Sequence, residues 1–264
     1  MKFVRLATTT VLTASILAGG VTAFADPNPV TKVETDSQIT FIADDESELE
    51  VIPPVTDPDV IIDPEVPGTT GPLSIIKAAT MDFGTQKISN QEQTYNMLTE
   101  WAPLADGSGD QVPYVSFAQV QDVRGTNEGW QLLVTLDDFT SSTQNNVLTG
   151  AKIKFVTGSI EYLGDASNAP TAHDNNMELE AGGDAQPVMT AADGQGAGAS
   201  SVVWGDQASL TAQFEDPAFD SDTDVIENEA IQLIVPGSTA KDATTYESTL
   251  TWELTATPDE NAGG

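Results

Sequence analysis

Two segments in the second half of the chain show a regular alternation of apolar and polar residues. Residues 250–256 read LTWELTA, in which every second position is apolar. Residues 130–136 read WQLLVTL and alternate in the same way, with one further apolar residue, Leu133, on the second side. Because successive side chains of a strand point to opposite faces of its sheet, both segments are predicted to be strands. The segment 130–136 is compatible with burial on both faces.

From residue 73 onward, short runs rich in Val, Ile, Leu, Phe and Thr recur between Gly, Asn, Asp and Pro residues. This spacing predicts an all-β, antiparallel, β-sandwich-like single domain. We expect strands near residues 73–77, 115–123, 130–136, 151–157, 159–162, 209–214, 230–234 and 246–256. Residues 164–200 are rich in Gly, Ala, Asn and Asp, which favours loop with short strands. Residues 91–98 and 224–231 look faintly helical but lack an apolar stripe, so no long helix is predicted.

The first 25 residues have the pattern of a secretory signal peptide. Lys2 and Arg5 accompany an uncharged, mostly apolar run over residues 6–21, and Ala23 and Ala25 form a small-x-small cleavage site. The apolar run is short for a membrane span and contains two adjacent glycines. We therefore expect cleavage after Ala25 and secretion of the remaining chain. The chain has no cysteine, which excludes a lipid anchor on that residue and any disulfide.

Residues 26–72 form an acidic, proline-rich N-terminal extension ahead of the predicted domain at 73–258. Residues 51–72 read VIPPVTDPDVIIDPEVPGTTGP, and such closely spaced prolines and acids favour an extended chain. One interpretation of this segment is an extended linker, and the other is a long surface loop. In the second interpretation, residues 39–42 (ITFI) pair with the main domain as an additional strand. Residues 259–264 are predicted to be a disordered tail.

The chain is strongly acidic, with a net charge of −32 from 41 acidic and 9 basic residues. Loss of Lys2 and Arg5 with the signal peptide changes this to −34, since 41 acids then face 7 bases. A chain without a basic surface does not neutralise phosphates, which excludes nucleic acid and disfavours anionic lipid as partners. Charge of this size favours solubility and carries no information about the fold.

Both alternating segments contain a Trp-x-Leu motif, at residues 130–132 and 252–254. The second motif lies in YESTLTWELTATP (246–258), and the first lies in VRGTNEGWQLLV (123–134), which LTGAKIKF (148–155) follows. With MDFGTQKIS (81–89), VPGSTAKDATTY (235–246) and the preceding Asp-Pro-rich segment, the chain resembles the WxL-domain surface proteins of low-GC Gram-positive bacteria. The resemblance covers nearly the whole chain and identifies residues 73–258 as the C-terminal WxL cell-wall-binding domain.

The resemblance implies non-covalent attachment to the peptidoglycan-containing cell wall, with the protein exposed at the cell surface and both motifs required. It implies that the ligand-binding residues are those of the two motifs, Trp130, Gln131, Leu132, Trp252, Glu253 and Leu254. It also implies partners, which are other surface proteins encoded beside such genes and include membrane-anchored WxL-interacting proteins. An alternative function follows from these partners, namely a subunit of a surface complex that contacts the wall indirectly. Adhesion to a host ligand has no support in the sequence beyond the expected location.

The motif tryptophans allow two interpretations. Trp and Leu at a spacing of two share one face of a strand, and the apolar face of a sheet is normally its core face. This favours a structural role for Trp252, since the opposite face of its segment is polar, whereas the two interpretations are balanced for Trp130. The alternative is an exposed aromatic platform for sugar rings on adjacent strands. Trp101 and Trp204 occur in turn-like sequences, where a tryptophan either covers a core or stacks on a sugar.

No catalytic or metal-binding constellation can be assembled from the sequence. His173 is the only histidine and there is no cysteine, so a cysteine nucleophile and a histidine-rich zinc site are excluded. Residues 220–224 (DSDTD) alternate carboxylates as a calcium loop does, but Val225 and Ile231 stand where an EF-hand needs Gly and Glu. No carboxylate pair is distinguished as that of a glycosidase. We expect no enzymatic activity, no catalytic residue, no metal and no cofactor.

Overall fold

The computed structural model describes residues 35–43, 50–173 and 175–256. The chain divides into two units, residues 1–40 and residues 41–264. The described part of the first unit, residues 35–40, has no regular secondary structure, and every described helix and strand belongs to the second unit. The predicted signal peptide (1–25) and the predicted tail (259–264) lie outside the described residues.

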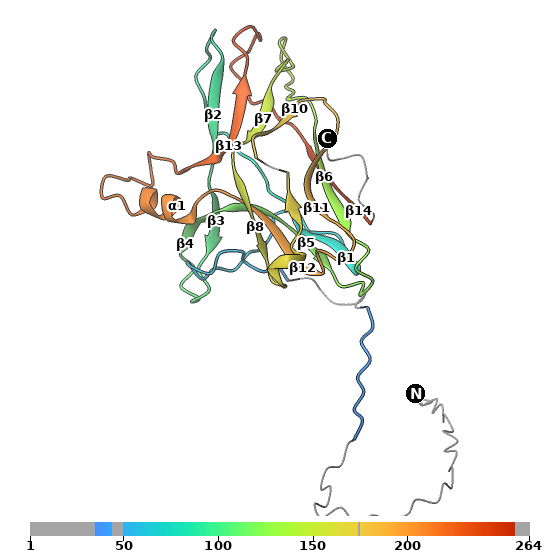
Figure 1. Ribbon diagram of the computed structural model, residues 1–264. Coiled ribbons are helices and arrows are strands. Elements are labelled where there is room, and N and C mark those ends of the chain that lie inside the picture. The colour runs from blue at the N-terminus through green and yellow to red at the C-terminus, as the bar shows by residue number, and fades with distance from the viewer. Residues whose placement is uncertain (1–34, 44–49, 174, 257–264) are drawn as a thin grey trace, which may run out of the picture. The chain divides into compact units, whose positions relative to one another are not determined.

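Antiparallel strands dominate the second unit, as the ribbon shows (Figure 1). The first sheet has the strand order β1 (Leu73–Lys77), β5 (Ser116–Asp122), β12 (Gly198–Trp204), β8 (Gly158–Tyr162). The second has the order β10 (Met177–Glu180), β7 (Lys152–Phe155), β13 (Glu227–Val235), β2 (Gln93–Leu98). The third has the order β14 (Leu250–Thr255), β6 (Trp130–Leu136), β11 (Gln186–Ala191), β9 (Thr171–Ala172), and β3 (Glu100–Pro103) pairs with β4 (Gln111–Tyr114). These sheets confirm the predicted all-β single domain.

The apolar core consists of two clusters that meet at β5. The larger cluster joins buried side chains from all three four-stranded sheets, including Phe155, Trp130 and Trp204. The smaller cluster contains Phe117 of β5, side chains of β4 and the helix α1 (Gln207–Phe214), and residues of the proline-rich segment. Because β5 is buried along nearly its whole length, it connects the two clusters.

The proline-rich segment 51–72 is part of the compact domain. Val51 and Val60 are buried in the smaller cluster. The main chain of Ile52 exchanges two hydrogen bonds with the side-chain amide of Gln119, at 3.0 and 2.7 Å. The hydroxyl of Tyr114 donates a hydrogen bond to the carbonyl oxygen of Val55 at 2.6 Å. The segment is therefore docked on the body as a surface loop, and the compact body begins before residue 73.

The strand expected at residues 39–42 is not formed. Residues 35–43 have no regular secondary structure, and the exposed fractions of Ile39, Phe41 and Ile42 are 74%, 84% and 89%. A strand needs a neighbouring strand for its amide and carbonyl groups, and none of the described strands pairs with this segment. The prediction of an additional strand in this domain was therefore wrong.

A helix replaces one predicted strand, and strands replace two faintly helical segments. Residues 209–214 belong to α1, because Asp206 accepts a hydrogen bond from the backbone of Ser209 at 3.0 Å and so caps the helix. The apolar residues Leu210 and Phe214 share one helix face, but with Ala212 they mimic the alternation of a strand. Residues 93–98 and 227–235 form β2 and β13. Residues 164–200 contain short strands, as expected, and also a 3-10 helix (Ala166–Asn168) that was not predicted; β12, which starts at Gly198, has seven residues.

Candidate functional site

The two Trp-x-Leu motifs lie side by side on neighbouring strands of the third sheet. β14 pairs with β6, which puts Leu254 opposite Leu132 and Trp252 opposite Val134. Each motif directs its Trp and Leu to one face of the sheet and its middle residue to the other, because side chains alternate along a strand. The expectation that the two motif strands lie close together in one domain is confirmed.

The first motif lies inside the protein. The side chains of Trp130 and Leu132 are fully buried, and Gln131 is buried as well. The indole Nε1 of Trp130 donates a hydrogen bond to the carbonyl oxygen of Gly196 at 3.1 Å. Gly196 has a φ of +71°, and a Cβ atom there would lie 2.7 Å from Trp130 Nε1, so glycine is needed beside the ring. Trp130 is therefore a core residue, held by the loop between β11 and β12.

The tryptophan of the second motif continues a row of aromatic rings. Half-buried Trp252 packs on Trp204 with ring centroids 6.1 Å apart, and Trp204 packs on Phe155 at 4.8 Å. These three rings come from β14, β12 and β7, which belong to three different sheets. Trp204 is fully buried and thus has the core position that one interpretation gave it. Trp101 is instead 44% exposed and contacts Phe214 edge-to-face.

The outer face of the motif strands is rich in hydroxyl and amide groups. We call it the threonine face and define it by Gln131, Thr135, Thr190, Thr251, Glu253 and Thr255. Thr251 lies opposite Thr135, and exposed Glu253 lies opposite Leu133. Gln131 donates a hydrogen bond to the hydroxyl of Thr190 at 3.2 Å, and the ring of His173 lies 3.0 Å from the same hydroxyl. The middle residues of both motifs therefore lie on the same side of the sheet, where Glu253 is exposed and Gln131 is buried.

A deep groove opens between two irregular segments, residues 81–88 and 241–248. We call it the interloop groove; its volume is about 910 Å³. Its base is apolar and is formed by side chains between the second and third sheets, among them Leu136, Phe139, Leu148, Leu233 and Leu250. Its rim carries threonines and a few charges of both signs. Both segments occur in the sequences MDFGTQKIS and VPGSTAKDATTY, which carry the family resemblance, but sequence reasoning assigned them no role.

Two residues hold the walls of the interloop groove in place. The ammonium group of Lys241 donates to the carbonyl oxygens of Ser89, Pro236 and Thr239, at 3.1, 3.2 and 3.0 Å, and so links the two wall segments. The hydroxyl of Tyr246 accepts a hydrogen bond from the backbone of Asp242 and donates one to the carbonyl oxygen of Asn145.

The backbone and side-chain amides of Asn145 also bond the carboxylate of Asp242 at 2.8 and 2.7 Å. These two hydrogen bonds lower the pKa of Asp242, because they stabilise its charged form. The 241–246 wall is therefore fastened to the neighbouring loop as well.

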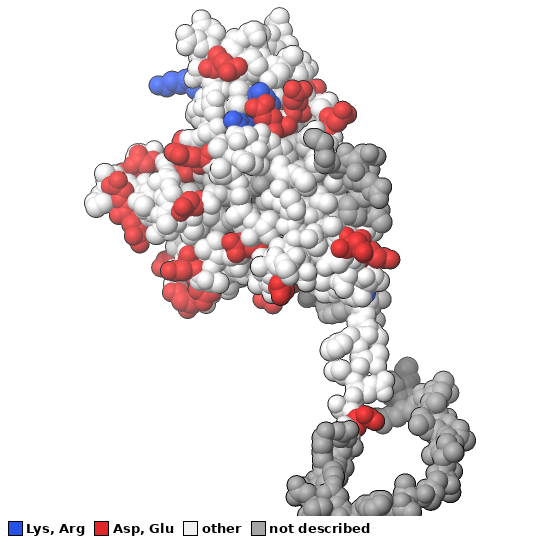
Figure 2. Space-filling model, viewed as in Figure 1, with Lys and Arg blue, Asp and Glu red and all other residues white. Residues whose placement is uncertain are grey.

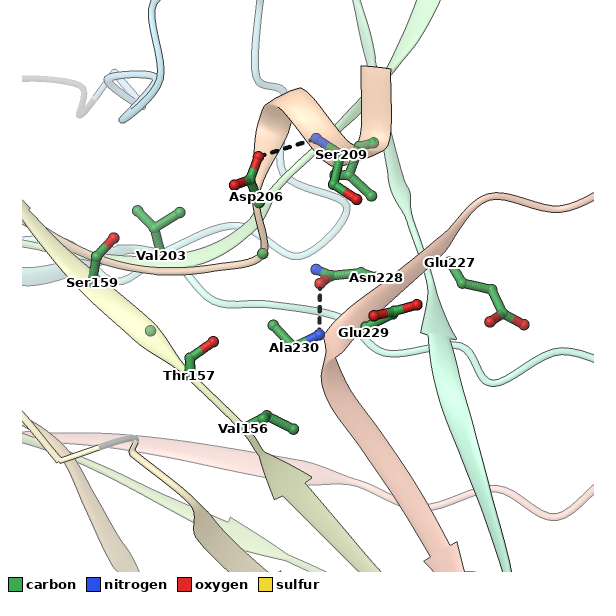
Figure 3. A pocket seen from close by; sticks show the side chains of 13 residues that line it. Val156, Thr157, Ser159, Val203, Asp206, Ser209, Glu227, Asn228, Glu229 and Ala230 are labelled. Carbon is green, nitrogen blue, oxygen red and sulfur yellow. Dashed lines mark hydrogen bonds between the residues drawn. The ribbon is translucent and has the colours of Figure 1, made fainter. Parts of the chain in front are cut away.

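A smaller and more polar pocket lies beside the start of α1 (Figure 3). Three of its polar side chains form hydrogen bonds within the protein. Asp206 caps α1, and the side chain of Asn228 accepts from the backbone of Ala230 at 3.1 Å and donates to the carbonyl oxygen of Trp204 at 3.0 Å. Glu227 accepts a hydrogen bond from the amide of Asn96 at 2.8 Å. These hydrogen bonds stabilise the junction of α1 and β13.

Acidic side chains are spread over the visible face of the protein, whereas Lys and Arg occur at few positions (Figure 2). In the acidic loop 220–224, the carboxylates of Asp220 and Asp224 accept hydrogen bonds from the loop's own backbone. Within the described ranges, no group of three or more His, Asp or Glu residues is placed to hold a metal ion. No helix of the described residues is long and apolar enough to cross a membrane.

Comparison with known proteins identifies the family. A family model described as WxL domain surface cell wall-binding matches residues 28–258, which is nearly the whole chain. No curated protein and no solved structure matches the chain. The match includes both motif strands and both walls of the interloop groove, and the description names binding to the cell wall and no catalytic activity. The chain therefore belongs to the family of WxL-domain surface proteins that bind the cell wall.

Proposed function

We propose that this protein is secreted and attaches non-covalently to peptidoglycan, with the threonine face as its contact surface. The observation that carries the proposal is the arrangement of the motifs, whose middle residues Gln131 and Glu253 share one outer face. Their apolar members Trp130 and Leu132 hold the strands in place from inside. Hydroxyl and amide groups on a rigid sheet suit the hydroxyl and amide groups of a glycan with peptide side chains.

Charge supports a contact of this kind. A chain with a net charge of −32 is repelled by a wall that carries anionic polymers, so long-range attraction does not bring the two together. Short-range hydrogen bonds from neutral groups remain effective under such repulsion, since they act at about 3 Å, well inside the screening length of about 8 Å. Of the motif residues, we assign exposed Glu253 to the contact surface and the other five to its support. Gln131 is buried and bonded to the hydroxyl of Thr190, and the Trp and Leu residues point to the inner face.

The test is co-sedimentation of the purified protein with purified peptidoglycan that carries no protein. Retention of the isolated protein supports direct attachment. Retention only after addition of a membrane-anchored surface protein, such as a WxL-interacting protein, supports the alternative function of a complex subunit. Washing with denaturant distinguishes non-covalent attachment, which is reversed, from a covalent bond.

A further inference from the structure

The pocket beside the start of α1 contains polar groups that the fold does not use. The carboxylate of Glu229 and the hydroxyls of Thr157 and Ser209 line the pocket and make no hydrogen bond or ion pair with the described residues. Asp206 caps α1 with one carboxylate oxygen, and its other oxygen has no partner among these residues. Because these groups come from β13, from the connection between β7 and β8 and from the start of α1, the fold brings them to one place.

The floor of the pocket is apolar. Val203, Leu210 and Ala230 line the pocket and are buried. In Figure 3, the hydroxyls of Thr157 and Ser209 point into the space between α1 and the strands. The volume of about 420 Å³ lies near the lower end of the range for ligand pockets, about 300–1,000 Å³, so the pocket suits one side chain or a small molecule.

The charge of the lining favours a cation. The lining contains the carboxylates of Asp206, Glu227 and Glu229 but no Lys, Arg or His. The positive end of α1 is already neutralised by Asp206, so it does not offset this charge. A primary ammonium group donates three hydrogen bonds, which the free carboxylate and hydroxyl oxygens can accept.

The combination of an acidic rim and an apolar floor indicates the rest of the ligand. A lysine side chain packs its methylene groups on apolar surface while its ammonium group remains among polar groups. A net charge of −32 repels a second copy of this chain and attracts a partner with exposed basic residues.

We propose that this pocket binds a lysine side chain of a second protein. The methylene groups lie on Leu210 and Ala230, and the ammonium group bonds the carboxylate of Glu229 and the hydroxyls of Thr157 and Ser209. The inference does not depend on the proposed contact with peptidoglycan, because it uses neither the threonine face nor any wall component.

Salt distinguishes this contact from attachment to the wall. Binding of an ammonium group to carboxylates is attractive, so it weakens as NaCl screens the charges. Attachment to an anionic wall opposes repulsion and is spared by salt. The failure of one account therefore leaves the other intact.

The first test is a titration with Nα-acetyl-lysine N-methylamide, followed by the backbone amide signals of the protein in NMR spectra. We expect an affinity of about 1 mM, since a probe of this size offers few contacts. The shifts should be confined to residues 156–159, 203–210 and 227–230 and should decrease with added NaCl. The matched probe is Nα-acetyl-norleucine N-methylamide, which keeps an alkyl stem but lacks the ammonium group, and it should cause no such shifts.

The variant D206N/E229Q tests the role of charge. Asparagine caps a helix about as well as aspartate does, so α1 should be retained while binding of the lysine probe weakens at least about fivefold. The control is E161Q/D193N, which removes two exposed carboxylates outside the pocket and should bind as the wild type does.

A second pair of variants tests the location. Ser209→Tyr fills the pocket from α1 and should abolish binding, whereas Ala208→Tyr places the same ring on an exposed neighbour that does not line the pocket. Circular dichroism confirms that both variants are folded. Absence of pocket shifts with the lysine probe, equal shifts with the norleucine probe, or unchanged binding by D206N/E229Q or by Ser209→Tyr would overturn the proposal.

Discussion

Leu254 of the second Trp-x-Leu motif lies directly opposite Leu132 of the first on two paired antiparallel strands. This register makes the two motifs one structural unit rather than two separate sites. Substitution of a core residue in either motif therefore disturbs the outer face that both strands share. A requirement for both motifs follows from this pairing, without contact between a tryptophan and the wall.

Replacement of Trp130 by alanine should destabilise the protein by about 3–5 kcal/mol. The side chain is fully buried, and its removal leaves a cavity and an unpaired carbonyl oxygen at Gly196. Urea denaturation followed by circular dichroism measures the loss. The control is Trp101→Ala, which removes a 44% exposed ring and should cost about 1 kcal/mol. Equal losses in both variants would show that Trp130 is not a core residue.

Replacement of Tyr246 by phenylalanine should cost about 1–2 kcal/mol and loosen the interloop groove. The hydroxyl joins the backbone of Asp242 to the carbonyl oxygen of Asn145, and both groups lose this partner. Amide hydrogen exchange should become faster in residues 241–248. Tyr162→Phe is the control, because its hydroxyl makes one exposed hydrogen bond, to the carbonyl oxygen of Ala197. Unchanged exchange in residues 241–248 would show that the hydroxyl does not hold the wall.

The carboxyl group of Glu100 should make stability depend on pH. Burial raises the pKa of Glu100 above its ordinary value of 4.5, although Lys77, 2.7 Å away, opposes this rise. Because the folded-state pKa is the higher one, the stability contributed by this group is fully present below pH 4.5. It is lost as the pH rises through the folded-state pKa.

Glu100→Gln isolates this contribution from that of the other carboxylates. Glutamine does not titrate, so the variant lacks the pH dependence of this carboxyl group, and it also removes the carboxylate partner of Lys77. Between about pH 4 and about pH 7, the unfolding free energy of the wild type should therefore fall relative to that of the variant. A constant difference across this range would contradict the raised pKa.

Binding to walls that contain teichoic acid should be spared or strengthened by moderate NaCl. Both surfaces are anionic, and salt shortens the range of their repulsion to about 8–10 Å near physiological ionic strength. Lowering the pH toward the sequence pI of about 4.1 should strengthen retention further, as carboxylates take up protons. Retention measured with and without a chelator also detects bridging by divalent cations. Steady release of the protein by moderate salt would indicate electrostatic attraction instead.

The motif strands could be predicted from the sequence, but their environment could not. Alternation in residues 130–136 and 250–256 gives the strands and the shared faces of their side chains. The alternation does not predict that β14 pairs with β6, because this pairing joins residues that are far apart in the sequence. The burial of Trp130 depends in the same way on the loop that contains Gly196, within a stretch that reads as loop.

The other differences between sequence and structure have local physical causes. Prolines in residues 51–72 favour an extended chain, but the pattern does not show that Gln119 and Tyr114 offer hydrogen bonds to that chain. Leu210 and Phe214 fit both a strand and a helix, and the cap at Asp206 decides between them. The interloop groove is assembled from segments about 160 residues apart, so no single motif indicates it.

In the proposed mode of attachment, the outer face of the motif strands, and not their tryptophans, contacts the wall. The most direct test is co-sedimentation with purified peptidoglycan of the variant T135V/T251V/E253Q, which removes two hydroxyls and one charge but no apolar core contact. The control is T94V/E180Q, which makes similar changes at exposed positions on β2 and β10. The first variant should keep its melting temperature and lose at least about tenfold in affinity, while the control should bind as the wild type does. Undiminished binding by T135V/T251V/E253Q would contradict it.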